Sequence, residues 1–155
     1  MYDFHDLVSP KSVLADVSVG TRKALFAQLG TVAGAVFDTD PRAVAELLAE
    51  RERLGSTAFG GGIAIPHARI ASLGQVGGVF LRLARPLDFA AVDDLPVDLV
   101  FALFSPPNAG SDHLKALARV SRALRDAAFR AKLRGAGSAD ALYALLSGVE
   151  ARDAA

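Results

Sequence analysis

The sequence lacks several features, and each absence excludes a class of protein. It contains no cysteine, which excludes disulfide bonds and thiol chemistry. It also has no excess of either charge, because 17 Lys and Arg residues balance 17 Asp and Glu residues. Binding along a phosphate backbone requires a broad basic surface, so we expect no nucleic-acid partner.

Long apolar runs are missing as well. The charge-free stretch "ALFAQLGTVAGAVF" (24–37) is shorter than the roughly 20 apolar residues that span a bilayer. The start, "MYDFHDLVSP", does not have the basic region and apolar run of a signal peptide. We therefore expect a soluble cytoplasmic protein with no direct membrane insertion.

The common cofactor motifs are also absent. The sequence has neither a "GxxxxGK[ST]" phosphate loop nor an "HExxH" pair, and the glycines at 60–62 are not followed by a lysine and a helix. A metal site built from His5, His67, His113 and Asp112 would join distant segments without any supporting spacing. We expect no metal and no cofactor, and we interpret His5 as a surface residue.

The chain does contain enough apolar residues, 52%, to form a core. Its length predicts a single domain over residues 1–155, with the core from about residue 10 to 148. Gly30 and Gly34 would weaken the first long helix unless it packs closely against a neighbour. Periodicity, caps and turn residues predict strands at 12–17, 63–65, 75–83 and 95–104, and helices at 21–37, 41–54, 111–124, 129–133 and 139–147.

Arg51 has an unusual position in the helix expected at 41–54. It follows Val44 by seven residues and Leu47 by four, so it continues the apolar stripe rather than the solvated face. One interpretation is a side chain that extends to solvent and complements the negative end of the helix dipole. The other is a charged group directed to a site.

His67 ends the motif "GGGIAIPH" (60–67). Ile63 and Ile65 are expected on one face of a strand, and strand pairing should stop at Pro66 because proline has no N–H to donate. His67 would then lie at a strand end, next to glycines whose bare backbone allows another group to approach closely. Considered alone, His67 could equally be a structural histidine.

His113 lies near the start of the helix expected from residue 111. With Ser111 as the N-cap, His113 would be the second helical residue, close to amide groups that attract anions. The positive end of the helix dipole should keep its ring neutral. A neutral imidazole can act as a nucleophile or donate one directed hydrogen bond.

Four motifs in this order carry a family resemblance: "RERLGST" (51–57), "GIAIPHAR" (62–69), "PVDLVFALFSP" (96–106) and "DHLKALARVSRAL" (112–124). They resemble the fructose/mannitol-type IIA domains of the bacterial phosphoenolpyruvate-dependent phosphotransferase system, and most of all the nitrogen-regulatory subgroup. The resemblance implies an α/β (α+β) fold, a mixed sheet flanked by helices on both faces. It also implies that His67 accepts a phosphoryl group from a histidine of an HPr-like phosphocarrier protein, with Arg51 and His113 stabilising its charge.

We therefore expect a regulatory IIA component that acts through its phosphorylation state on a downstream protein such as a kinase, a potassium transporter or a permease. One alternative is a sugar-specific IIA subunit that passes the phosphoryl group to a IIB domain. Another is a binding module on the same fold that is never phosphorylated. The joint presence of Arg51, His67 and His113 argues against the second alternative.

Overall fold

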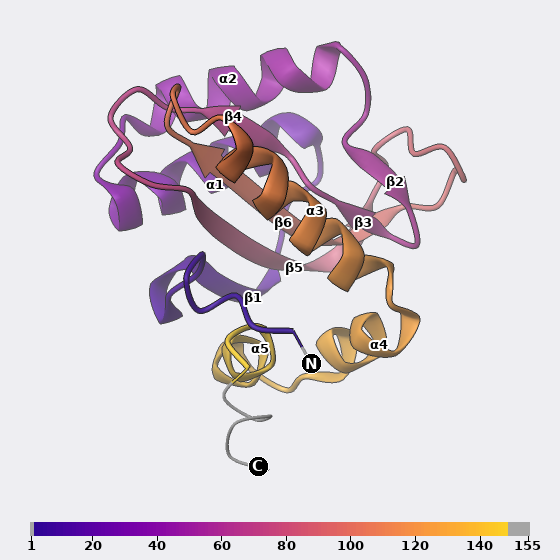
Figure 1. Ribbon diagram of the computed structural model, residues 1–155. Helices are drawn as coiled ribbons and strands as arrows, with labels where there is room; N and C mark the ends of the chain where they lie inside the picture. The colour runs from indigo at the N-terminus through magenta and orange to yellow at the C-terminus, as the bar shows by residue number, and fades with distance from the viewer. Residues whose placement is uncertain (1, 149–155) are drawn as a thin grey trace.

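The computed structural model describes residues 2–148, so the tail beyond the core expected from the sequence lies outside the described residues. After a short 3-10 helix (Pro10–Ser12), strands and helices follow one another along the chain (Figure 1). The strands are β1 (Val13–Val17), β2 (Ala58–Gly60), β3 (Ile63–Ala64), β4 (His67–Arg69), β5 (Gly77–Leu87) and β6 (Val97–Ser105). The helices are α1 (Arg22–Phe37), α2 (Pro41–Arg53), α3 (Ser111–Arg125), α4 (Ala127–Gly135) and α5 (Ala139–Leu146).

The strands form one mixed sheet in the order β1-β5-β6-β3-β2, and β4 also pairs with β6. β5 and β6 run antiparallel at its centre, whereas β1 is parallel to β5 and both β3 and β4 are parallel to β6. β2 and β3 form an antiparallel hairpin. The central strands are almost fully buried, as expected for strands that are covered on both faces.

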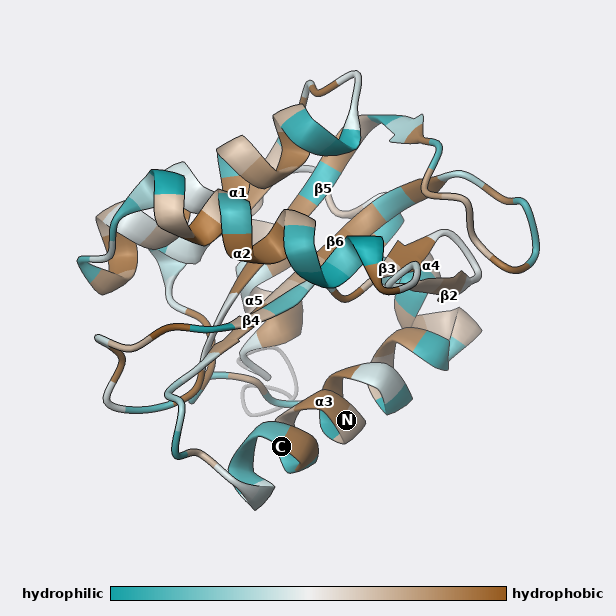
Figure 2. Ribbon diagram, turned by 90° about the horizontal axis from the view of Figure 1, so that it is seen from above, coloured by the Kyte–Doolittle hydropathy of each residue, from teal (hydrophilic) through white to brown (hydrophobic). Residues whose placement is uncertain are grey.

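Helices cover both faces of this sheet, as predicted. Figure 2 shows α1 and α2 on one side of the central strands and α3 on the other. One apolar cluster joins α1 and α2 to the sheet, and a second joins α3, α4 and α5 to the opposite face. Within residues 2–148, no helix has both the length and the hydropathy needed to cross a membrane.

Local sequence signals explain where the helices begin. The Thr21 hydroxyl, the Asp40 carboxylate and the Ser138 hydroxyl each accept a backbone N–H in the first turn of α1, α2 and α5, respectively. Gly30 lies where α1 crosses the start of α2, and a methyl group at this position would collide with the Pro41 carbonyl. The two α1 glycines are thus explained by the predicted close packing, since Gly34 also faces Pro41.

The sequence-based boundaries were wrong in several places. The β2–β3 hairpin was not anticipated, because three- and two-residue strands show no measurable alternation. β5 extends to Leu87 through residues expected to form a loop, and α4 is longer than the expected 129–133. Leu47, expected in the core, is 37% exposed.

Candidate functional site

His67 is the first residue of β4 and does not lie beyond the end of strand pairing. β4 pairs with β6 in parallel, with His67 opposite Leu103. The prediction that pairing stops at Pro66 was therefore wrong. Proline lacks only the donor, and the Pro66 carbonyl still accepts a hydrogen bond from the Leu103 N–H at 2.9 Å.

The position of β4 exposes His67 to both helical layers. Side chains alternate along a strand, and Ala68 packs in the α1/α2 cluster, so His67 and Arg69 project toward the α3 side. β4 pairs with β6 alone and is therefore an edge at this level of the sheet. The C-terminal part of α2 packs beside that edge, so a long side chain from α2 can reach the ring.

Two hydrogen bonds define the protonation of the His67 ring. Nδ1 lies 3.0 Å from the Ile65 carbonyl oxygen, which can only accept, so Nδ1 carries the hydrogen. Nε2 accepts a hydrogen bond from Nε of Arg51 at 3.1 Å. Both contacts fit the same neutral tautomer, whose unshared electron pair is on Nε2 and points toward a guanidinium.

Arg51 is held in place at the end of α2. Its side chain is half-buried, and besides the contact with His67 it donates from a terminal nitrogen to the Gly55 carbonyl at 2.9 Å. The carbonyls near the last turn of a helix attract a cation, which supports this conformation. Arg51 is thus directed into the site, and the interpretation as a freely extended surface side chain was wrong.

His113 lies on the other side of the site. Its side chain is nearly buried, at 7% exposed, and its ring centroid is 5.5 Å from that of His67. Nδ1 contacts the hydroxyl of Ser105, a fully buried residue at the end of β6. The expected N-cap was wrong by one residue: Gly110 is the N-cap, so His113 is the third helical residue.

Both imidazoles are held neutral by their surroundings. Burial lowers the pKa of His67 below 6.5, and the nearby charges of Arg51 and Arg69 lower it further, against opposing effects of the Ile65 carbonyl and Glu52. Burial also lowers the pKa of His113, and the charges of His67 and Arg69 act in the same direction. Two neutral rings near an arginine form a site suited to an incoming anion.

The sequence analysis missed several supporting residues. Arg69 could have been found, because it is two residues from His67 on the same strand and so projects to the same face. Its guanidinium donates to the Pro107 carbonyl in the loop before α3. The buried carboxylate of Glu52 accepts hydrogen bonds from both the N–H and the hydroxyl of Thr57, which fixes the segment between α2 and β2. Sequence spacing gives no signal for Glu52, because it depends on a tertiary turn.

A pocket of about 370 Å³ opens beside His67 and Arg51. Its rim includes two exposed apolar side chains, Phe59 and Leu114, which are 41% and 65% exposed, respectively. The guanidinium of Arg125 lies over the Phe59 ring at 5.5 Å. Exposed apolar groups around a polar centre are typical of a surface that contacts another protein.

The glycines at 60–62 have a different role from the one expected. All three have positive φ and form the β2–β3 turn. A side chain on Gly61 or Gly62 would meet the guanidinium of Arg130 or Arg134, and Arg134 donates to the Gly61 carbonyl at 2.7 Å. The group that approaches this bare backbone therefore comes from α4 of the same chain.

The remaining histidine is separate from the site. His5 pairs with Asp3 through its Nδ1 at 2.8 Å and is exposed, as predicted. Within residues 2–148, no three His, Asp or Glu side chains come close enough together to hold a metal ion. The polar centre therefore consists of Arg51, His67 and His113, with Arg69 beside them.

Comparison with known proteins agrees with this arrangement. Residues 6–149 match the family model described as phosphoenolpyruvate-dependent sugar phosphotransferase system, EIIA 2. The chain belongs to this family. A nitrogen regulatory protein of Bradyrhizobium diazoefficiens is 46% identical over 142 residues, covering 92% of this chain and 93% of that protein.

Two further relatives show the range of the family. The crystal structure of the nitrogen regulatory protein IIA-Ntr from Neisseria meningitidis matches with a TM-score of 0.85 and 34% identity, covering 90% of this chain and 96% of that one. A fructose-specific EIIA component from Haloferax volcanii is 38% identical, covering 78% of this chain and 77% of that protein. The chain is thus a IIA component of the phosphotransferase system, with relatives named for both regulation and sugar transport.

Proposed function

We propose that this IIA component accepts a phosphoryl group on Nε2 of His67 from the phosphohistidine of an HPr-like phosphocarrier protein. The observation that carries the proposal is the pair of hydrogen bonds on the His67 ring, from Nδ1 to the Ile65 carbonyl and from Arg51 to Nε2. Together they leave the nucleophilic electron pair on the nitrogen that faces the guanidinium.

The transfer balances without a metal or an external base. The Nε2 electron pair attacks phosphorus, a new N–P bond forms, and the donor's N–P bond breaks, returning its electrons to the donor ring. The acceptor ring becomes positively charged and keeps its Nδ1 proton. The Ile65 carbonyl, which accepts that N–H at 3.0 Å, stabilises this charge.

The surrounding cations would act on the phosphoryl oxygens. In the unphosphorylated protein Arg51 donates to Nε2, so on transfer the same N–H moves to an oxygen of the incoming group. Arg69 adds positive charge on the same face of β4. The neutral ring of His113, fixed by Ser105, is close enough to donate one further hydrogen bond.

The exposed apolar rim would receive the carrier. Phe59 and Leu114 border the same pocket as His67, so a partner that buries them brings its own histidine to Nε2. Burial of this apolar surface excludes water from the phosphoryl group during transfer.

We infer a regulatory role in the cytoplasm, supported by relatives that are named nitrogen regulatory proteins along nearly their whole length. The fructose-specific relative supports a second candidate, relay of the phosphoryl group to a sugar-specific IIB domain. Both use the same chemistry at His67 and differ only in the next acceptor.

The proposal is tested by incubating the protein with phosphoenolpyruvate, enzyme I and a phosphocarrier protein and measuring intact mass. We expect one acid-labile phosphoryl adduct that is absent from His67→Ala and present in His5→Ala, the matched exposed control. An adduct that persists in His67→Ala would overturn the assignment. Addition of a fructose-type IIB domain then distinguishes the two roles, because a relay subunit transfers the group rapidly and a regulatory one retains it.

A further inference from the structure

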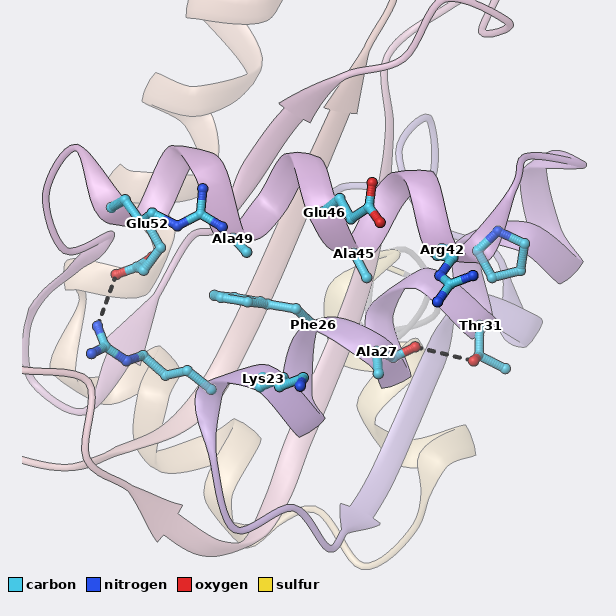
Figure 3. Close-up of a pocket in the computed structure, with 12 residues that line it drawn as sticks. Lys23, Phe26, Ala27, Thr31, Arg42, Ala45, Glu46, Ala49 and Glu52 are labelled. Carbon is cyan, nitrogen blue, oxygen red and sulfur yellow. Dashed lines mark hydrogen bonds and ion pairs between the residues drawn. The ribbon is translucent and has the colours of Figure 1, made fainter.

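A second and larger cavity lies between α1 and α2, on the side of α2 away from the three-residue centre. Its volume is about 800 Å³, and its lining is mostly apolar. Figure 3 shows the Phe26 ring between the two helices, with Ala45 and Ala49 of α2 above it and Ala27 of α1 below. Small side chains on both helices leave this groove open along their length.

The rim of the groove carries cations at both ends. Lys23 lies on α1, Arg42 begins α2 and Arg53 ends it. All three are exposed, and none makes an ion pair with another residue of the described chain. Figure 3 shows Lys23 and Arg42 at separate points along the groove.

The acidic side chains of the groove do not cancel this charge. Glu52 is buried, accepts two hydrogen bonds from Thr57 and forms an ion pair with Arg22 at 3.8 Å. Glu46 is the other acid of the lining. The groove therefore has an apolar floor and an unpaired excess of positive charge at its rim.

We propose that this groove binds an acidic amphipathic helix of a partner protein. Arg42 and Arg53 are eleven positions apart on α2, which at about 1.5 Å per residue separates them by roughly 16 Å, or three helical turns. A helix of that length places apolar side chains at i, i+3 or i+4, and i+7 over Phe26 and the alanines. Its terminal carboxylates then reach the cations at both ends, which a compact anion cannot do.

The groove is separated from His67 by the body of α2. Arg51 contacts the His67 ring, whereas the next residue, Glu52, lines the groove. A partner helix in the groove would leave the rim of the His67 pocket open to a phosphocarrier protein. The inference does not depend on phosphorylation, because it uses only the shape and charge of the α1–α2 face.

The test uses two synthetic helical peptides of about four turns with the same leucine stripe. One carries glutamates at both ends and the other carries lysines. We expect the acidic peptide to bind the full-length protein, with amide chemical-shift changes confined to α1 and α2, and the basic peptide to bind at least about tenfold more weakly. The combined change Lys23→Glu and Arg42→Glu should reverse this preference.

Lys132→Glu is the matched control, because Lys132 is exposed on α4, which packs on the opposite face of the sheet. It should leave both affinities unchanged. Equal binding of the two peptides, shifts centred on His67, or no shift at about 1 mM acidic peptide would each overturn the proposal. Concentration-dependent self-association that is lost in Ala45→Arg would assign the groove to a second copy of this chain and would also overturn it.

Discussion

Replacement of Arg51 by alanine removes the cation that faces the proposed nucleophile. In the unphosphorylated protein it removes two hydrogen bonds, one to Nε2 of His67 at 3.1 Å and one to the Gly55 carbonyl at 2.9 Å. In the transfer reaction it removes a charged donor from the phosphoryl oxygens. These two losses act in opposite directions, because freeing Nε2 makes its electron pair more available.

The magnitude follows from the strength of a charged hydrogen bond. Such bonds contribute about 1.5–3 kcal/mol, and each 1.4 kcal/mol corresponds to about tenfold in rate. The ground-state bond to a neutral nitrogen offsets part of this, so we expect transfer to slow by about 10- to 100-fold. The fold should tolerate the change, since Arg51 is only half-buried at a helix end, and we expect a loss of about 1 kcal/mol or less in unfolding free energy.

The assay is quenched-flow transfer from the phosphorylated carrier, followed by intact mass, with thermal unfolding measured in parallel. Arg53→Ala is the control, because Arg53 is exposed in the same helical turn and makes no contact with His67. Arg51→Lys should recover only part of the rate, since an ammonium lacks the planar donor pair. Transfer at the full rate in Arg51→Ala would remove Arg51 from the mechanism.

Three further predictions concern pH and packing. The folded pKa values of His67 and His113 lie below 6.5, so the unfolded chain takes up protons first as pH falls, and urea unfolding at about pH 5.5 should show lower stability than at about pH 7.5; His113→Asn should reduce that difference, and an unchanged difference would contradict the assignment. Gly30→Ala should destabilise the fold by about 1–3 kcal/mol despite its better helix propensity, whereas Gly135→Ala, where a methyl group meets nothing, should be neutral or stabilising in the same chemical denaturation. Glu52→Gln should cost about 1–3 kcal/mol because a buried, doubly hydrogen-bonded carboxylate is lost, and an unchanged denaturation midpoint would show that these bonds carry no net stability.

The long elements were predictable because each carries several independent signals. α2 has Asp40 as cap, Pro41 at its first position and an apolar stripe, and the structure begins the helix at that proline. β6 is apolar throughout and is buried on both faces. The segment from Ala58 to Arg69 was not predictable in detail, because its short strands depend on pairing with β6 and with each other.

The site was predictable in its main residues but not in its geometry. Arg51 was recognised because a charge interrupted an apolar stripe, and the structure directs it to His67. The tautomer of His67 depends on the Ile65 carbonyl, whose direction is set by the backbone around Pro66. No sequence pattern reveals that the β6 residue Ser105 contacts the His113 ring, because the two meet only after folding.

The central claim is that Nε2 of His67 is the phosphoryl acceptor. Two-dimensional ³¹P–¹H and ¹⁵N NMR of the enzymatically phosphorylated, ¹⁵N-histidine-labelled protein identifies the bonded nitrogen directly. The hydrogen bond from Nδ1 to Ile65 predicts phosphorus coupling to Nε2 of His67, with the Nδ1 proton retained. Phosphorus on Nδ1, on His113 or on His5 would contradict the account.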